Sequence, residues 1–381
     1  MGKKVIFVSY GDSTNASSWS NVPYLFSQSL EKKGFELVRM DISPDPLHHF
    51  LWDRFVAKVL STCYTDHVYS YMRSWVFRIL IFRKIKKAVK ENDDAYFCIF
   101  LNFEFYNKFS KIPTLLFGDW TYDIVIFDHL KRKPYFFEKW FIKYQAKAIK
   151  KAELVVSLFK DCSEKISSRY NKDVRHLGIN VVNDLNLQAI SHEEILEKKK
   201  FSNEILFIGS RKYIEGAKKL VEAFKVMQIT NPELQLNLIG IQKEDLLDHE
   251  LPNVHFFGYL RKDNPTENKL YYSLLINAKV LVNPSENWAA YSSSIEAMKY
   301  CTPVIIKPYK AFTEDFGFEN DFGYYLVNTS VNCIIESIQS VFLAENYVQL
   351  CKNASYKVKD FTWENYVEKL IAMMSEIKQL K

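Results

Sequence analysis

The sequence predicts an α/β protein made of two doubly wound parallel-sheet domains in tandem. Two observations lead to this prediction: strand-like and helix-like segments alternate along the chain, and the alternation restarts after a charged connecting segment. The length of 381 residues and the hydrophobic content of 48% are sufficient for two cores of ordinary size. Such sheets bind ligands at the carboxyl ends of their strands, so we expect a cleft between two facing sheets.

The first domain is predicted to open with a strand at 3–10, a polar loop, a helix at 21–33 closed by Gly34, and a strand at 36–40. Further strands are predicted at 95–101, 114–117, 124–127 and 154–158. This order is typical of βαβ units, which place parallel strands beside one another.

Two segments of the first domain, 73–90 and 131–151, are predicted to form amphipathic helices with aromatic residues on one side and lysine or arginine on the other. Two interpretations remain open for them. Each helix either packs on the core with a solvated basic face, or contacts an anionic membrane surface.

The charged segment 184–202 is predicted to connect the two domains. After it, strands are predicted at 204–209, 234–240, 254–258, 279–283 and 303–307, and helices at 214–227, 270–277 and 293–299. The repeated pattern indicates a second parallel sheet covered on both faces.

Charge and cysteine content limit the functional classes. A net charge of +6 is modest for this length, so no nucleic acid partner is expected. The six cysteines lie far apart, with no Cys-x-x-Cys pair, which indicates buried free thiols and no metal site. The sequence starts directly with a strand and has no apolar run of membrane-spanning length, so we expect a cytoplasmic protein. If the basic helices bind lipid, the protein would lie on the inner face of the membrane.

The loop 284–294 leaves a predicted strand and enters a helix, and its serines and alanines carry little bulk. Backbone N–H groups and hydroxyls can therefore approach a diphosphate at the start of the helix. Glu296 could accept hydrogen bonds from both ribose hydroxyls of a nucleotide. The alternative is that Ser293 and Glu296 form a capping box, which would only begin the helix.

In the first domain, polar side chains follow predicted strands. Asp119 comes after 114–117 and could orient an acceptor hydroxyl or act as a base, or it could cap the next helix. Asn102 and Glu104 follow 95–101 and are further cleft candidates. In the loop 11–20, Asp12 and Ser13 could approach a phosphate or an acceptor hydroxyl, or belong to an ordinary surface loop.

The segment PSENWAAYSSSIEAMKYCTPVI resembles the family-4 type of GT-B glycosyltransferases, whose usual form is PSxxEGFGxxxxEAMAxGTPVI. Collinear segments also resemble this family, namely ILFIGSRKYIEGAKKLVEAF, NVHFFGYL, EKWFIKYQAKAIKKAELVVSLFKDCSEKI and FTWENYVEKLIAMM. The resemblance implies a GT-B architecture with an acceptor-binding domain at 1–185, a nucleotide-sugar-binding domain at 186–355, and a final helix at 356–381 that crosses back to the first domain.

The resemblance also implies a reaction. The protein would transfer a sugar from a nucleotide-diphosphate sugar to a hydroxyl of a glycan or lipid-linked acceptor, with retention and without a metal or other cofactor. It implies that Glu296 contacts the ribose and that the phosphates meet the helix start. It also implies that Gly258 and Tyr259 lie beside the base. The phosphate contacts would come from Tyr291, Ser292, Ser293 and Ser294.

The sequence departs from the family pattern at two places. Trp288 stands where the family has its first glutamate, so an aromatic ring could stack on the donor sugar there. The family's basic pair is replaced by Ser210 and Glu215, and the adjacent Arg211 and Lys212 could neutralise the diphosphate instead. Two alternatives stay open: a nucleotide-sugar epimerase, because the fold alone does not fix the function, and an inactive scaffold or sugar-binding subunit, which these departures could mark.

Overall fold

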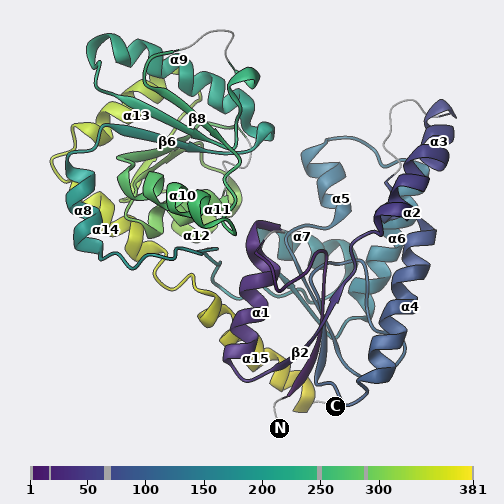
Figure 1. Cartoon of the computed structure of the whole chain (residues 1–381). Coiled ribbons are helices and arrows are strands. Elements are labelled where there is room, and N and C mark those ends of the chain that lie inside the picture. The colour runs from purple at the N-terminus through teal and green to yellow at the C-terminus, as the bar shows by residue number, and fades with distance from the viewer. Residues whose placement is uncertain (1–2, 17–18, 64–69, 247–250, 287–290, 380–381) are drawn as a thin grey trace. The chain divides into compact units, whose positions relative to one another are not determined.

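The alternation of strands and helices in the sequence produces two separate parallel sheets. The computed structural model describes residues 3–16, 19–63, 70–246, 251–286 and 291–379 (Figure 1). The chain divides into an N-terminal unit, Met1–Gly178 with Tyr366–Lys381, and a C-terminal unit, Ile179–Asn365. The first boundary therefore lies earlier in the chain than residue 185.

The N-terminal unit contains a five-stranded parallel sheet in the order β2-β1-β3-β4-β5. Its strands are β1 (Lys4–Ser9), β2 (Glu36–Asp41), β3 (Phe97–Phe100), β4 (Thr114–Gly118) and β5 (Leu154–Ser157). β3, β4 and β5 are buried throughout, as expected for parallel strands covered on both faces.

Helices cover both faces of this sheet. The larger helices of the unit are α1 (Val22–Lys32), α4 (Trp75–Glu91), α6 (Phe136–Lys151), α7 (Lys160–Tyr170) and α15 (Trp363–Gln379). One core cluster joins alternate strand residues to α4, α6 and α7. On α1, Phe26 packs against Phe7 and Phe117, and on α15 Tyr366 packs against the same Phe117, which places α1 and α15 together on the other face.

A helical rod made of α2 (Pro46–Leu51), the π-helical segment η2 (Trp52–Ala57) and α3 (Lys58–Cys63) runs on from β2 (Figure 1). Its anchor is Tyr71, in the short helix η3 (Tyr71–Arg73), whose ring lies against His48, His49 and Trp52. No residue of α2 or η2 is buried. The rod therefore presents most of its side chains to solvent.

The C-terminal unit contains a six-stranded parallel sheet in the order β11-β10-β9-β6-β7-β8. The strands are β6 (Glu204–Ile208), β7 (Gln235–Ile239), β8 (Val254–Gly258), β9 (Val280–Asn283), β10 (Val304–Ile306) and β11 (Gly323–Tyr325). The helices are α8 (His192–Lys200), α9 (Ile214–Thr230), α10 (Pro265–Asn277), α11 (Tyr291–Lys299), α12 (Lys310–Phe316), α13 (Val331–Phe342) and α14 (Tyr347–Lys357). α9 packs against α13, and α8 and α11 both pack against α14.

The two-sheet α/β fold class predicted from the sequence is confirmed, and so are the two amphipathic helices, which form α4 and α6. The strand predicted at 124–127 is wrong. These residues belong to α5 (Tyr122–Ile124) and to the π-helical segment η4 (Val125–His129), because a short apolar run fits a buried helix as well as a buried strand.

The segment 184–202 is also more ordered than a connection. It contains α8, which begins with a capping box between Ser191 and Glu194 and belongs to the C-terminal unit. Of the cysteines with described side chains, Cys98, Cys162, Cys301 and Cys351 are buried free thiols, and Cys333 is a half-buried one. Within the described residues, no helix has both the length and the apolar character that crossing a membrane requires.

Candidate functional site

A cavity of about 300 Å³ lies at the carboxyl ends of β1, β3 and β4 in the N-terminal unit. Three residues predicted from the sequence line it, Asn102, Glu104 and Asp119. They meet there because β3 and β4 are adjacent parallel strands whose carboxyl ends lie at one edge of the sheet. Other lining side chains were not predicted: Tyr10, Trp19, Trp120 and Gln145. We call this cavity the strand-end pocket.

Asn102 lies in a tight turn after β3. Its Oδ1 accepts hydrogen bonds from the backbone N–H groups of Glu104 and Phe105, at 2.9 and 3.0 Å. The side chain is 9% exposed, and its Nδ2 has no hydrogen-bond partner among the described residues. Buried amide donors are normally paired, so this group is suited to donate to a ligand oxygen in the strand-end pocket.

Asp119 follows the carboxyl end of β4 and is half-buried. The indole Nε1 of Trp19 donates to its Oδ2 at 3.1 Å, and its backbone carbonyl accepts from Ser157 Oγ at 3.0 Å. These bonds hold the carboxylate at the pocket wall. A carboxylate in this position can accept a hydrogen bond from a substrate hydroxyl.

Glu104 is paired with Tyr10, whose hydroxyl donates to Glu104 Oε2 at 2.6 Å. Burial raises the pKa of the Glu104 carboxyl, although the Tyr10 hydroxyl and the nearby Arg73 and Arg78 act in the opposite direction. Burial and the Glu104 carboxylate both raise the pKa of Tyr10. The pair therefore holds a proton more firmly than the isolated side chains would.

Asp12 and Ser13 do not line the strand-end pocket. The exposed Asp12 carboxylate accepts from the Thr14 backbone N–H and hydroxyl, at 2.8 and 2.7 Å, and from Asn15 Nδ2 at 2.9 Å. The bonds from Thr14 lower the pKa of Asp12. Ser13 is 2% exposed. The Asp12 side chain therefore shapes its own loop, as short polar side chains often do in turns.

In the C-terminal unit, glycines at the ends of β6, β7 and β8 bring the following loops close together. A Cβ at Gly240, where φ is +87°, would lie 2.5 Å from the Gly209 carbonyl oxygen. A Cβ at Gly258, where φ is +60°, would lie 2.6 Å from Gln242 Nε2. Tyr259, the next residue, is 76% exposed. A flat, exposed ring at a strand end is available for stacking.

Glu296 lies on α11 and is buried among three donors. Its carboxylate forms an ion pair with Lys262 and accepts from the hydroxyls of Tyr271 and Tyr272, at 2.9 and 3.2 Å. Lys262 Nζ also donates to the Asn183 carbonyl oxygen at 3.3 Å. Burial and the Glu296 charge raise the pKa of Tyr271. A ribose at Glu296 would therefore compete with bonds that the carboxylate already makes.

The start of α11 differs from the expected open phosphate loop. Tyr291 is buried, with its hydroxyl donating to Asp315, and Ser294 is fully buried. Ser293 is buried within the helix, not at its N-cap, so the capping-box alternative is wrong. Ser292 is exposed. Trp288 lies outside the described residues.

The basic side chains after β6 are at the surface. The Arg211 side chain is 82% exposed, with Nε 3.5 Å from Asp245 Oδ1. Lys212 Nζ lies 4.7 Å from the centre of the Tyr213 ring. Ser210 is exposed and precedes the short helix η5 (Arg211–Tyr213). All three remain accessible to a ligand at this strand end.

The sequence analysis also missed Lys219, a cation on α9. Its Nζ donates to Thr329 Oγ1 at 2.5 Å and lies 3.4 Å from Oε1 of Glu286, in the loop after β9. The Thr329 hydroxyl and Lys219 lower the pKa of Glu286. Lys218 and Lys219 are adjacent in the sequence, but they lie on different faces of α9, and only Lys219 reaches the loop after β9. No group of three or more metal-ligating side chains is found among the described residues.

Comparisons with known proteins show a family match in the C-terminal part of the chain and a similarity in fold over the whole chain. Residues 190–361 match the family model for glycosyl transferases group 1. No curated protein sequence matches the chain.

Several solved structures are similar in fold. Sucrose-phosphate synthase from Thermosynechococcus elongatus has 15% identity and a TM-score of 0.64, with 99% of each chain covered. WaaG, a glycosyltransferase involved in lipopolysaccharide biosynthesis, has 13% identity and a TM-score of 0.61, with 96% of this chain and 99% of that chain covered. A UDP-N-acetylglucosamine 2-epimerase-type protein from Listeria monocytogenes has 12% identity and a TM-score of 0.60, with 100% of this chain and 98% of that chain covered. The chain therefore has the GT-B fold, and residues 190–361 match the glycosyl transferases group 1 model.

Proposed function

We propose that the protein transfers a sugar from a nucleotide-diphosphate sugar to a hydroxyl of a glycan or lipid-linked acceptor. The main support is the match of residues 190–361 to the glycosyl transferases group 1 family, because this region includes the strand ends and α11. The strand-end pocket of the N-terminal unit is a second, independent support. It offers a carboxylate and a buried amide donor of the kind that bind hydroxyl-rich ligands.

In the proposed donor site, Glu296 accepts hydrogen bonds from the ribose, and Lys262 either moves aside or contacts the nucleotide. Arg211, Lys212 and Lys219 are the cations available to the diphosphate at the carboxyl ends of β6 and β9. Cations are needed there because negative charge develops on the departing nucleotide diphosphate. Ser292 provides an exposed hydroxyl at the start of α11.

In the proposed acceptor site, Asp119 orients the attacking hydroxyl or receives its proton, and Asn102 Nδ2 donates to a neighbouring oxygen. Trp19 fixes the Asp119 carboxylate, since its indole donates to it at 3.1 Å. Trp19 and Trp120, both in the pocket wall, supply flat apolar surface for a sugar ring.

The test is to incubate the protein with a panel of nucleotide sugars, with and without glycan acceptors, and to follow both the donor and the product. We expect donor consumption to depend on acceptor, and Asp119→Asn to lower the rate by roughly 10²-fold or more. Asp94→Asn is the matched control, because Asp94 is exposed and pairs with Lys4.

The epimerase alternative is favoured by one observation, the fold similarity to the Listeria protein. Interconversion of the donor sugar without any acceptor would support it and contradict transfer. If neither nucleotides nor nucleotide sugars raise the melting temperature, the inactive scaffold becomes the better explanation.

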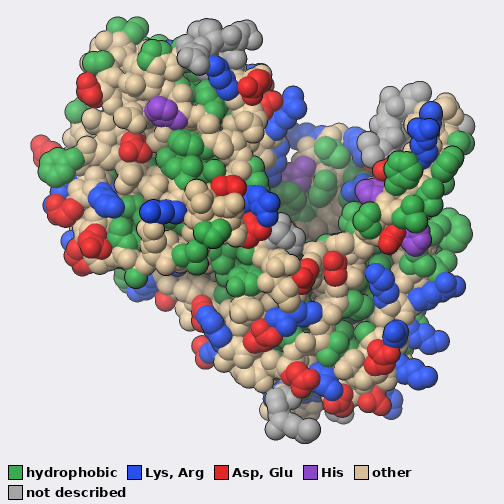
Figure 2. All heavy atoms as spheres, viewed as in Figure 1, with side chains coloured by type: hydrophobic (Ala, Val, Ile, Leu, Met, Phe, Trp, Pro, Cys, Tyr) green, Lys and Arg blue, Asp and Glu red, His purple; other side chains and the backbone are tan. Residues whose placement is uncertain are grey.

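We further propose that the acceptor is presented at an anionic membrane surface, where the protein binds peripherally. The rod α2–η2–α3 exposes large apolar side chains beside basic ones, and Figure 2 shows hydrophobic side chains along its surface. The exposed apolar residues are Leu47, Phe50, Leu51, Phe55, Val56 and Val59. Apolar and basic side chains on one helix are typical of binding to anionic lipid surfaces.

Flotation with liposomes tests the membrane contact. Phe50→Ser with Phe55→Ser should abolish flotation with anionic liposomes if the rod inserts. Charge reversal on α4 should also weaken flotation if the basic helix contributes; the residues to reverse are Lys84, Lys86 and Lys87. Equal flotation of the wild-type protein with neutral and anionic liposomes would contradict the electrostatic part.

A further inference from the structure

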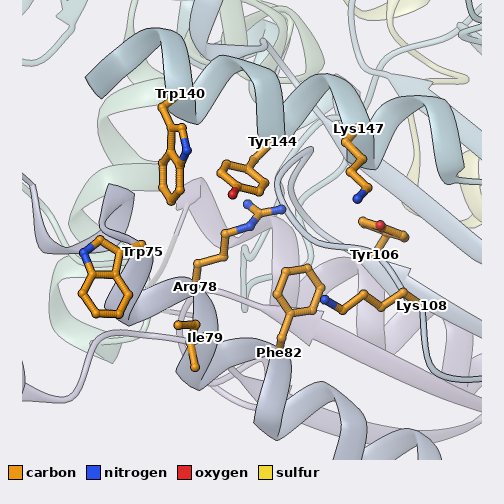
Figure 3. Close-up of a pocket in the computed structure, with 9 residues that line it drawn as sticks. All are labelled: Trp75, Arg78, Ile79, Phe82, Tyr106, Lys108, Trp140, Tyr144 and Lys147. Atoms are coloured by element: carbon orange, nitrogen blue, oxygen red, sulfur yellow. The ribbon is translucent and has the colours of Figure 1, made fainter. Parts of the chain in front are cut away.

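A second cavity of the N-terminal unit, of about 400 Å³, lies between α4 and α6. Figure 3 shows its lining: side chains from the first turns of α4 face others from α6, with the segment after β3 closing one end. We call this cavity the α4–α6 groove. Its chemistry is not used by the proposed donor and acceptor sites.

Three cations converge on the groove, and the nearest acid, Glu104, lies outside its lining. Arg78 comes from α4, Lys147 from α6 and Lys108 from the segment after β3, and the lining contains no aspartate or glutamate. None of the three forms an ion pair with a carboxylate within the described parts of the chain. Three positive charges beside a single carboxyl repel one another, and a bound anion would reduce that repulsion.

The positions of Arg78 and Lys108 are fixed by aromatic rings. The Arg78 guanidinium lies 4.0 Å from the centre of the Tyr144 ring and 5.0 Å from that of Phe82. Lys108 Nζ lies 4.1 Å from the centre of the same Phe82 ring. Burial and the charges of Arg78 and Lys147 lower the pKa of Lys108, which agrees with three neighbouring cations. Arg78 and Lys108 are therefore held in place before a ligand arrives.

Exposed indoles border the cations. Trp75 is 59% exposed and Trp140 is 39% exposed, and Figure 3 shows both at the end of the groove away from the lysines. The Trp140 ring meets Tyr144 edge-on at 4.3 Å. Flat aromatic surfaces beside cations suit a ligand with an anionic head and a sugar ring or hydrocarbon body.

The groove adjoins the strand-end pocket. Arg78 donates to the backbone carbonyl of Glu104 at 3.3 Å, and Glu104 lines the strand-end pocket. On α6, Tyr144 lines the groove while its neighbour Gln145 lines the strand-end pocket. One extended ligand could therefore contact both cavities.

We propose that the α4–α6 groove binds a phosphate ester whose organic part is a sugar or a hydrocarbon chain. Arg78, Lys108 and Lys147 contact the phosphate, and Trp75 and Trp140 contact the organic part. Because the groove adjoins the strand-end pocket, we assign the phosphate ester to the phosphate-bearing part of the acceptor. This assignment rests on the proposed glycosyl transfer. The phosphate site itself does not depend on that proposal.

The experiment measures binding to the full-length protein by isothermal titration calorimetry with glucose 1-phosphate and with inorganic phosphate, and by co-sedimentation with phosphatidylglycerol or phosphatidylcholine vesicles. The groove variant is Lys108→Gln with Lys147→Gln. The matched control is Lys111→Gln with Lys150→Gln, which removes the same charge from the same segment and the same helix, outside the groove.

We expect the groove variant to bind its phosphate ester at least about tenfold more weakly than the control, since two charge-assisted contacts are lost. Trp140→Ala should weaken glucose 1-phosphate binding but not inorganic phosphate binding. A difference between the variants seen only with phosphatidylglycerol vesicles identifies a lipid headgroup as the source, and one seen with glucose 1-phosphate identifies a soluble or glycan phosphate. Equal binding by the groove and control variants to every probe would overturn the proposal.

The same variants separate this inference from the proposed function. If the groove variant loses phosphate binding while no nucleotide sugar is consumed by any form of the protein, the phosphate site stands and glycosyl transfer fails. If the wild-type protein transfers sugar and the groove variant does so with unchanged acceptor KM, the assignment of the groove to the acceptor fails.

Discussion

Glu296 and Lys262 should be strongly coupled in the free energy of unfolding. Their side chains are 5% and 13% exposed. Glu296→Gln removes the charge and retains the shape, so the Lys262 ammonium loses its counterion and keeps only neutral acceptors, the glutamine Oε1 and the Asn183 carbonyl at 3.3 Å. Removing one member of a buried pair leaves an uncompensated charge. We expect a loss of about 3 kcal/mol for the C-terminal unit.

Lys262→Met should cost less, about 1–2 kcal/mol, because the hydroxyls of Tyr271 and Tyr272 continue to donate to the carboxylate, at 2.9 and 3.2 Å. The double variant has neither charge, so it should be no less stable than Glu296→Gln alone. The coupling energy of the pair is then about 1–2 kcal/mol.

Amide hydrogen exchange measured by mass spectrometry suits this test, with peptides from α10 and α11 as reporters. A chain of two units does not unfold in a single transition, and exchange reports the stability of one unit. Glu244→Gln is the control, because Glu244 is exposed in the same unit. Effects of the two single substitutions that add to within about 0.5 kcal/mol would refute the coupling.

Three further predictions concern stability. Burial alone would raise the pKa of Glu138, but bonds from Arg132 hold this pKa at about 2. The stabilising charge is therefore present above pH 4.5 and is lost as the pH falls toward 2. Glu138→Gln should therefore destabilise the N-terminal unit by about 2–3 kcal/mol at pH 7, with a difference in urea unfolding that shrinks below pH 4.5. A Cβ at Gly323 would lie 2.0 Å from the Val304 carbonyl oxygen, so Gly323→Ala should cost about 1–3 kcal/mol, and unchanged amide exchange in the C-terminal unit would contradict this strand pairing. Burial lowers the pKa of Lys199 to about 7, so above that pH the unfolded chain binds the proton more tightly. The stability of the wild-type protein relative to Lys199→Met should therefore rise between pH 7 and pH 9, and a flat profile would count against a neutral buried amine.

Part of the candidate site could be predicted from the sequence, because residues that follow parallel strands gather at one edge of the sheet. Asn102, Glu104 and Asp119 each follow a strand, and the carboxyl ends of adjacent parallel strands meet at one edge. Asp12 and Ser13 obey the same rule by position but do not line the pocket. The Asp12 carboxylate instead accepts hydrogen bonds from Thr14 and Asn15 in its own loop. The position of Asp12 in the sequence does not reveal these bonds.

Partners that are distant in the sequence could not be predicted. Glu296 was expected to be open to a ribose, yet Lys262, Tyr271 and Tyr272 surround it. Which side chain of the loop after β8 turns inward depends on packing against α10 and α11. The strand expected at 124–127 failed for a related reason, since a short apolar run fits either a helix or a strand until its neighbours are known.

The sequence by itself determined the two parallel α/β sheets, most of their strands, the amphipathic character of α4 and α6, and the resemblance of the C-terminal region to glycosyltransferases. These properties depend on local periodicity and on residues close together in the chain. Only the tertiary structure decided which charges are paired and which are not. Arg78, Lys108 and Lys147 come from three separate segments, and only the packing of α4 against α6 brings them to one groove. The energy of a charge depends on what lies within a few ångströms of it, and sequence separation carries little information about that distance.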